Sequence, residues 1–164
     1  MSYKNTPEDF KPRFFIIDDD PIVSKVMEAR LLAQFPHCEV TSTTQPVVAP
    51  DQHIYFVDND FGGTKLATHL LRQIRELNPN ALVIAMSSSL DLASLEELMN
   101  GGCNAIYNKS CPSQAKEVFE VIDNYTNIIK NTHSLNNGTP LRGIIHSLQA
   151  LIKQWNQRLS KDID

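Results

Sequence analysis

The stretch Arg13-Phe14-Phe15-Ile16-Ile17-Asp18-Asp19-Asp20 decides how the rest of this sequence is interpreted. A short apolar run that ends abruptly in acidic residues is typical of a strand buried on both faces that emerges at one edge of a sheet. Asp20-Pro21 then predicts the start of a helix, because aspartate caps N–H groups and proline fits the first helical position. Apolar residues recur at helical spacing up to Phe35, and Pro36 ends that helix.

Three later segments repeat this pattern of an apolar run followed by polar residues. A β-branched segment predicts a weaker strand, and helical spacing of apolar residues predicts helices between the runs. Pro46 and Pro50 bracket a loop after the weak strand, and Gly101-Gly102 is predicted to form a left-handed C-cap. The predicted strands lie at 13–17, 39–43, 54–57, 81–86 and 105–107, and the predicted helices at 21–35, 66–74, 91–100 and 112–125.

Strands alternate with helices five times over residues 13–130, which predicts an α/β fold with a parallel sheet covered by helices on both sides. Residues 1–12 are predicted to be a flexible lead, and residues 131–139 have the composition of a linker. Residues 140–164 are predicted to form a detached amphipathic helix. Its apolar stripe must be covered, either by the domain itself or by a second copy or a partner, and the sequence leaves that choice open. The stripe comprises Leu141, Ile144, Ile145, Leu148, Leu151, Ile152, Trp155 and Leu159.

The composition excludes several classes of protein. Apolar residues make up 41% and charged residues 21% of the chain, which is enough to build a core. The net charge of −4 gives no electrostatic footprint for nucleic acid or an anionic membrane, and the longest uninterrupted apolar run, 81–86, is far too short to span one. The 3 cysteines lack CxxC spacing, so neither a disulfide framework nor a zinc site is predicted. With no apolar leader at its start, the chain is expected to be a soluble cytoplasmic protein.

Polar side chains follow four of the predicted strands. Acidic groups stand at 18–20 and 58–60, Ser87 follows the fourth strand, and Lys109 follows the fifth. Because ligands of open parallel sheets bind at the carboxyl ends of the strands, we expect these groups at one rim. Grouped carboxylates repel one another, and a hard, oxygen-seeking ion such as Mg²⁺ relieves that repulsion. A lysine and a hydroxyl beside them predict a site for a divalent cation and a phosphoryl group.

Residues 13–130 resemble a receiver domain of bacterial two-component response regulators, of the flavodoxin-like chemotaxis type. The resemblance rests on an ordered set: an acidic pair after the first strand, Asp58 after the third, Ser87 after the fourth and Lys109 after the fifth. It implies a five-stranded parallel sheet with (βα)5 topology and strand order 2-1-3-4-5. It also implies that the protein is a signalling switch rather than an enzyme, with a sensor histidine kinase or phosphotransfer protein upstream and a protein target downstream.

The resemblance also implies a Mg²⁺ cofactor and the residues that hold it. Asp19 would ligate the ion directly, and Asp18 would act largely through water. Asp58 would share the ion, and Asp60 occupies the position at which the family supplies a backbone carbonyl. Asp20 is assigned instead to capping the first helix.

The phosphoryl chemistry implied by the resemblance involves three side chains. Asp58 would accept the phosphoryl group from the histidine of a kinase. Ser87 would bind a phosphoryl oxygen, and Lys109 would pair with Asp58 or with its phosphate. Addition of this charge would then change a protein-binding face.

The sequence departs from the family pattern at three places. Phe61-Gly62 replaces the Met-Pro that usually follows the acceptor, and Ser110 replaces the proline that usually follows the lysine. Ile106 holds the place of a switching aromatic residue, and strand alternation predicts that Tyr107 points to the opposite face.

Two other functions fit parts of the sequence. These departures would suit a receiver that acts as an adaptor or dimerisation module without being phosphorylated. Asp58-Asn59-Asp60 also resembles the Asp-x-Asp signature of haloacid-dehalogenase-type phosphatases, although the order of the acidic motifs disfavours that family. The segment around His133 resembles the histidine box of sensor kinases only faintly, and a polar linker is the favoured interpretation there.

Overall fold

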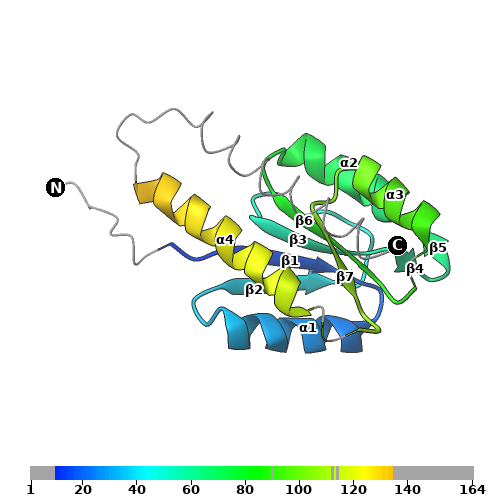
Figure 1. Cartoon of the computed structure of the whole chain (residues 1–164), viewed down its shortest axis with the longest axis horizontal. Helices are drawn as coiled ribbons and strands as arrows, with labels where there is room; N and C mark the ends of the chain where they lie inside the picture. Colours follow the sequence, from blue (N-terminus) through cyan, green and yellow to red (C-terminus); the bar gives the residue numbers. More distant parts are fainter. Residues whose placement is uncertain (1–9, 90, 112, 114, 135–164) are drawn as a thin grey trace.

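Five strands form one parallel sheet in the computed structural model, which describes residues 10–89, 91–111, 113 and 115–134 (Figure 1). The order along the sheet is β2-β1-β3-β6-β7, which is the predicted order 2-1-3-4-5 with two short strands inserted in the numbering. The central strands β1, β3 and β6 carry almost only buried side chains, as expected for strands covered on both faces. The strands are β1 (Arg13–Ile17), β2 (Glu39–Thr43), β3 (Ile54–Asp58), β6 (Leu82–Ser87) and β7 (Ala105–Asn108).

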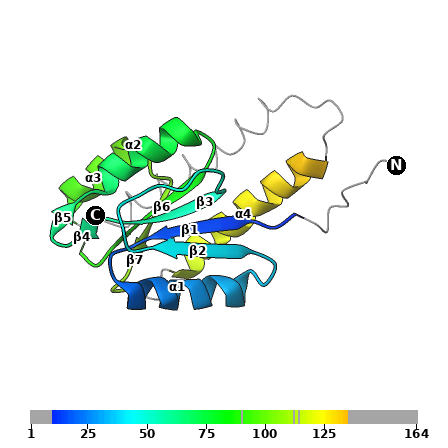
Figure 2. The same cartoon turned by 180° about the vertical axis from the view of Figure 1, so that it is seen from behind.

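Four helices cover the two faces of this sheet, as seen from both sides in Figures 1 and 2. Helices α1 (Pro21–Gln34) and α4 (Ala115–Ser134) pack on one face, and α2 (Ala67–Leu77) and α3 (Leu92–Asn100) pack on the other. Strand alternation supplies both cores, since Phe14 and Ile16 belong to the first and Phe15 and Ile17 to the second. None of the helices in the described part of the chain is long and apolar enough to cross a bilayer.

Two of the predicted helix boundaries rest on capping residues, and the structure shows how each of them caps its helix. Asp20 caps α1 by accepting hydrogen bonds from the N–H groups of Ile22 (2.8 Å) and Val23 (3.4 Å), as predicted. At the end of α3 only Gly102 is left-handed (φ 98°), whereas Gly101 keeps a helical conformation (φ −70°). The left-handed cap predicted at this pair is therefore confirmed, and Gly102 forms it.

Helix α4 is longer than the spacing of its apolar residues predicted. It continues to Ser134, so the first four residues of the segment with linker composition, His133 among them, have a helical backbone. Polar residues such as Asn131 and Thr132 do not forbid a helix once earlier turns are packed against the sheet. The rest of that segment, the predicted helix at 140–164 and most of the predicted lead at 1–12 lie outside the described residues.

The connection between β2 and β3 departs from a complete (βα)5 pattern, because residues 44–53 form a loop without a helix. Pro46 and Pro50 bracket this loop as predicted. Two side chains from the sheet hold it: Tyr55 Oη donates to the Ala49 carbonyl (2.7 Å), and Arg13 Nε donates to the Asp51 carbonyl (2.7 Å). The fold therefore has four helices rather than five among the residues that the structure describes.

A small antiparallel hairpin follows β3, and the sequence did not predict it. Strands β4 (Asp60–Phe61) and β5 (Thr64–Lys65) pair with Asp60 opposite Lys65. Gly62 and Gly63 connect them with φ angles of 56° and 84°. Two left-handed residues in a two-residue loop are typical of a type I′ turn, for which glycine is strongly favoured.

Candidate functional site

The carboxyl ends of the parallel strands bring together the polar residues that the sequence predicted there. Strand β1 pairs with both β2 and β3, so the chain reverses its direction of winding between β1 and β3. This is the topological switch point at which open α/β sheets bind ligands. Asp18 directly follows β1, Asp58 ends β3, and Lys109 directly follows β7. The Lys109 N–H donates to the Ser87 carbonyl (2.8 Å), which continues the ladder between β6 and β7 to the edge of the site.

Lys109 joins the two buried acids of the site. Its Nζ donates to Asp18 Oδ2 at 2.7 Å and to Asp58 Oδ1 at 2.8 Å. The side chains of Asp18, Asp58 and Lys109 are 0%, 4% and 15% exposed, so both ion pairs are largely shielded from water. Burial alone would lower the pKa of Lys109, but the hydrogen bonds to Asp18 and Asp58 outweigh it and raise that pKa. The ammonium group therefore stays charged at neutral pH.

Asp58 has the most unusual environment of the acids in the site. Burial raises its pKa from 3.8 to about 6, and the negative charge of Asp18 acts in the same direction. The hydrogen bond and the charge of Lys109 and a backbone hydrogen bond from Asp60 oppose this rise. At neutral pH the Asp58 carboxylate is thus ionised, but only at the cost of desolvation.

Asp18, Asp19 and Asp58 form what we call the acid cluster. Each offers a carboxylate oxygen, and these oxygens lie within 4.8 Å of one another. Three carboxylates face one ammonium group, so the cluster has an excess of negative charge. Oxygen-only donors at this spacing fit a hard divalent cation such as Mg²⁺, which would supply the missing positive charge.

Backbone N–H groups orient two carboxylates of the acid cluster. The Asp20 N–H donates to Asp18 Oδ1 (2.9 Å), and the Gly62 N–H donates to Asp19 Oδ2 (2.8 Å). The second contact joins the loop after β1 to the β4–β5 hairpin, and sequence reasoning missed it. Only the Gly62-Gly63 pair, a combination that favours turns, indicates in the sequence that the backbone bends sharply after Asp58.

Ser87 and Asp60 are placed differently from the acid cluster. Ser87 is buried, and its hydroxyl donates to the Ser89 carbonyl (2.8 Å) and accepts from the Ser89 N–H (3.3 Å). This local turn, rather than a contact with Asp58, occupies the hydroxyl. Asp60 is exposed on β4, and its carboxylate is not part of the acid cluster. The metal ligand expected from Asp60 is its backbone carbonyl. The position of its carboxylate therefore does not bear on that expectation.

The residues before Lys109 lie as strand alternation predicted. Ile106 packs in the core under α2 and α3, and Tyr107 packs in the core under α1 and α4. The Tyr107 hydroxyl accepts a hydrogen bond from Arg30 Nη1 of α1, a contact that the sequence did not predict. Ser110 follows Lys109, and no peptide bond among the described residues is cis.

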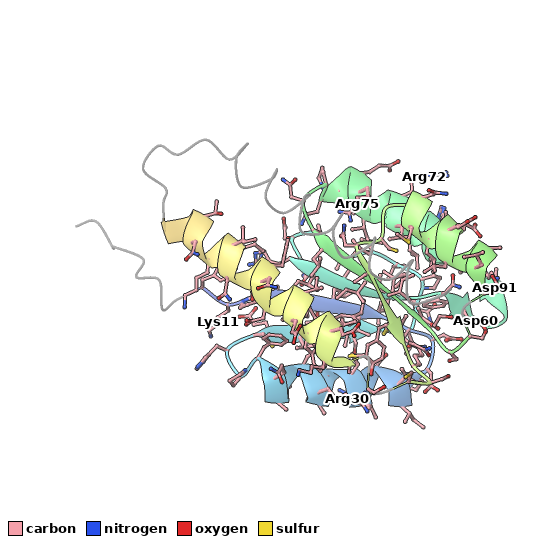
Figure 3. All side chains as sticks on the ribbon, in the orientation of Figure 1. Lys11, Arg30, Asp60, Arg72, Arg75 and Asp91 are labelled. Carbon is pink, nitrogen blue, oxygen red and sulfur yellow. The ribbon has the colours of Figure 1, made fainter. Side chains whose placement is uncertain are left out.

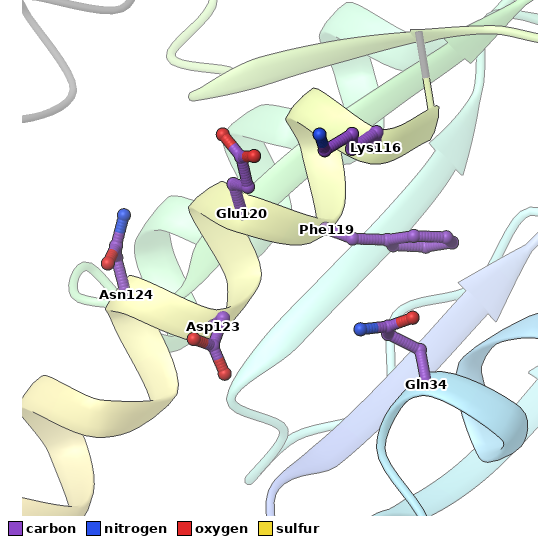
Figure 4. A pocket seen from close by; sticks show the side chains of 6 residues that line it. All are labelled: Gln34, Lys116, Phe119, Glu120, Asp123 and Asn124. Carbon is purple, nitrogen blue, oxygen red and sulfur yellow. The ribbon is translucent and has the colours of Figure 1, made fainter. Parts of the chain in front are cut away.

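A groove between α1 and α4 lies apart from this site. Its lining contains no residue of the acid cluster and does not contain Lys109 (Figure 4). We therefore assign the chemistry to the rim of the sheet rather than to this hollow. The groove is lined by Gln34, Lys116, Phe119, Glu120, Asp123 and Asn124.

Comparison with known proteins supports the fold. The BeF3-activated DrrB receiver domain superposes with a TM-score of 0.61 at 15% identity and covers 72% of this chain and 99% of that one. A response regulator receiver domain protein from Clostridium thermocellum gives a TM-score of 0.61 at 18% identity, covering 74% and 98%. A chain described as adenylate cyclase from Rhodopirellula baltica gives 0.60 at 21% identity, covering 79% and 100%. This chain thus has the fold of response-regulator receiver domains.

Comparison with known sequences does not assign the chain to a family. No family model matches the chain. The glutamine-hydrolysing GMP synthase of Gloeothece citriformis is 23% identical over 138 residues, which covers 80% of this chain. The match spans only 22% of the length of that synthase. It therefore transfers no activity to the present chain.

Proposed function

We propose that this chain is a receiver that accepts a phosphoryl group on Asp58 from a phosphohistidine of a sensor kinase or phosphotransfer protein. The observation that carries the proposal is the bridge of Lys109 to both Asp18 and Asp58, at 2.7 and 2.8 Å, beside the exposed carboxylate of Asp19. It combines a nucleophile, a fixed positive charge and a cation site at one rim of the sheet. Phosphoryl transfer depends on such positioning and charge stabilisation.

In the proposed transfer, an oxygen of the Asp58 carboxylate attacks the phosphorus atom. A phosphorus–oxygen bond forms, the phosphorus–nitrogen bond to the donor histidine breaks, and its electron pair returns to the imidazole nitrogen. With a pKa of about 6, Asp58 is ionised at neutral pH and therefore competent as the nucleophile. Lys109 already contacts Asp58 and would stabilise the charge that develops on the phosphoryl oxygens.

The proposed cofactor is Mg²⁺, held by Asp19 directly, by Asp18 largely through water, by Asp58 and by the backbone carbonyl of Asp60. When bound, the ion withdraws negative charge from the phosphoryl oxygens. Asp18 and Asp58 already face Lys109, and Asp19 is exposed next to them, so an ion can approach from solvent. This donor set supports the assignment.

Ser87 is proposed to bind a phosphoryl oxygen after transfer. To do so its hydroxyl would leave the Ser89 carbonyl, at present 2.8 Å away, and rotate toward Asp58. Phosphorylation adds a charge of about −1.5 to −2, which would favour that rotation and draw Lys109 onto the phosphate. The loop that follows β6 would then change its conformation.

The biological role that follows is a signalling switch in the cytoplasm. The phosphorylated receiver, which we place at residues 13–130, would present a changed surface to a downstream protein. A homodimer formed through residues 140–164 remains part of this proposal, although that segment lies outside the described residues. The composition supports neither nucleic acid nor a membrane as a partner.

The geometry of the site also bears on the two alternative functions, a phosphatase and an adaptor. A haloacid-dehalogenase-like phosphatase would need the Asp60 carboxylate as a general acid near Asp58, but this carboxylate is exposed and lies outside the acid cluster. An adaptor that is never phosphorylated is favoured by the inward packing of Ile106 where the family has its switching aromatic residue. An adaptor of that kind has no need to bind Mg²⁺, so measured Mg²⁺ affinity separates it from the proposal.

Intact-mass spectrometry tests the proposed function. After incubation with acetyl phosphate and Mg²⁺, the wild-type chain should gain one phosphoryl group, and Asp58→Asn should gain none. Asp123→Asn is the matched control, because Asp123 is an exposed acid on α4, outside the site (Figure 4). Absence of an adduct on the wild type, or an equal adduct on Asp58→Asn, would contradict the proposal.

A further inference from the structure

The β4–β5 hairpin is attached to three separate parts of the molecule. The Phe61 side chain is 8% exposed and belongs to the core under α2 and α3. The Gly62 N–H donates to Asp19 Oδ2 at 2.8 Å, and Lys65 Nζ donates to the Ser94 hydroxyl of α3 at 2.7 Å. Both views of the fold place the hairpin beside the start of α3 (Figures 1 and 2). The turn of the hairpin therefore reaches the acid cluster, and its second strand reaches a helix.

We propose that this hairpin is the positioning element of the cation site, holding Asp19 through Gly62 and tying it to α3 through Lys65. The inference rests on the proposed function only in so far as the acid cluster binds a divalent cation. Asp19 requires such an element more than its neighbours do. Asp18 and Asp58 are buried and fixed by Lys109, whereas Asp19 is exposed. An exposed side chain must lose rotamer freedom before it can ligate an ion.

The Gly62 contact is suited to this task. A hydrogen bond from a backbone N–H to a carboxylate is charge-assisted and holds one oxygen of Asp19 in place. The contact leaves the other oxygen of that carboxylate as a ligand atom for the ion. The N–H can point at Asp19 because Gly62 adopts a φ of 56°, a conformation that side chains disfavour. The hairpin also follows Asp58 within two residues, so nucleophile and positioning element share one short segment.

Lys65 supplies the link to α3. Although Lys65 belongs to an exposed strand, its ammonium group binds the hydroxyl of Ser94, which is 5% exposed. The Ser94 N–H is itself bound by the helix cap Asp91 at 2.7 Å. The chain of contacts from Asp19 through Gly62 and Lys65 to Ser94 therefore joins the cation site to the first turn of α3. If this tether favours the ligating position of Asp19, loosening the hairpin at α3 weakens cation binding, and a bound cation strengthens the tether by the same factor.

The substitution Lys65→Met separates a positioning role from a purely electrostatic one, because the two roles predict opposite changes in Mg²⁺ affinity. Removing a positive charge near an acidic site should tighten Mg²⁺ binding if only long-range charge matters. Loss of the hairpin tether should weaken it, by about 5-fold or more, as for other groups that orient metal ligands. Lys25→Met is the matched control, since Lys25 is an exposed lysine of α1 that carries the same charge and pairs with Glu28 (2.9 Å) rather than with the hairpin.

Isothermal titration of the full chain with Mg²⁺ tests the proposal. Weaker binding is expected for Lys65→Met and for Ser94→Ala, which removes the same hydrogen bond without changing charge. In the Asp19→Asn background the Lys65→Met effect should vanish, because the ligand that the hairpin positions is already lost. Lys65→Arg should restore part of the affinity.

Each outcome of this titration decides one claim. Unchanged or tighter binding in both Lys65→Met and Ser94→Ala would overturn the hairpin proposal while leaving the proposed function intact. A full effect that persists in the Asp19→Asn background would also overturn it. Failure of the wild-type chain to bind Mg²⁺ would instead remove the cation site itself, and both proposals with it.

Discussion

Two cations shielded by the fold, Arg75 and Lys109, stand at opposite ends of the same strand. Arg75 of α2 contacts the region just before β7, and Lys109 lies just after β7 (Figure 3 labels Arg75). Arg75 donates to the carbonyl oxygens of Gly102, Pro79 and Ala81 and to Asn104 Oδ1, at 2.6 to 3.1 Å. Lys109 donates to two carboxylates. One cation thus binds neutral acceptors, and the other binds charged ones.

Because of this difference we call Arg75 the structural cation and Lys109, a residue of the proposed site, the functional cation. Burial lowers the pKa of Arg75, and its hydrogen-bond partners in the described part of the chain are neutral, yet a guanidinium group stays protonated. Its planar fork joins the loops that precede β6 and β7 into a fixed arrangement. The partners of Lys109 carry more negative charge than it neutralises, and this excess supports the cation that we propose there.

The largest effect is expected at the structural cation. Arg75→Met should lower the free energy of unfolding by about 3–5 kcal/mol, because several part-buried carbonyl groups lose their donor at once. Urea unfolding measures this change. Arg72→Met on the exposed side of the same helix is the control and should change stability by at most about 0.5 kcal/mol. Mg²⁺ should not rescue Arg75→Met, and a rescue would break the distinction between the two cations.

A smaller, rescuable effect is expected at the functional cation. Lys109→Met should lower the free energy of unfolding of the metal-free chain by about 2–3 kcal/mol, because two buried carboxylates lose their counter-charge. Millimolar Mg²⁺ should restore most of this loss, since a cation can replace the ammonium group. Lys116→Met, an exposed lysine of α4, is the control. Equal destabilisation with and without Mg²⁺ would place Lys109 in the same structural class as Arg75.

The smallest effect concerns Asp58 and pH. Its pKa is about 6 in the folded chain and 3.8 in the reference state, so folding favours the protonated form. The associated stability is present below about pH 4 and is lost as the pH rises through about 6. In metal-free protein at pH 8, Asp58→Asn should therefore be more stable than wild type by about 1–2 kcal/mol. Denaturant unfolding of both chains from pH 4 to pH 8 measures the gap, and a gap that shrinks with rising pH would contradict the assignment.

Much of the site was predictable from local sequence. Buried parallel strands are near-continuous apolar runs, so their ends are visible wherever polar residues begin. That rule placed Asp18, Asp58 and Lys109 at one rim, and the structure brings them within hydrogen-bond distance. It also placed Ile106 and Tyr107 on opposite faces. The alternation of side chains along a strand depends only on backbone geometry, so no knowledge of distant contacts is needed.

Other features depend on contacts that no local pattern records. Strands β4 and β5 have two residues each, which is too short for any periodicity to show. From the sequence, the Ser87 hydroxyl could bind either a group in the site or the backbone of its own turn. The fold shows that it donates to the Ser89 carbonyl. Arg75 has the sequence signature of an ordinary residue in the last turn of a helix, yet it binds acceptors both in the loop that follows α2 and in the distant loop before β7.

Local sequence alone indicated a parallel sheet and the identity of the acids and the lysine at its rim, because burial on both faces leaves a continuous apolar run in the central strands. The order of the strands came from the resemblance to receiver domains, and the structure confirms it. Only the packed fold could show that Gly62 binds Asp19, that Lys65 reaches Ser94 and that Arg75 reaches the loop before β7. These are single hydrogen bonds between segments remote in the chain. Their directions depend on where whole elements finally pack, and that position is a property of the complete fold rather than of any one stretch of residues.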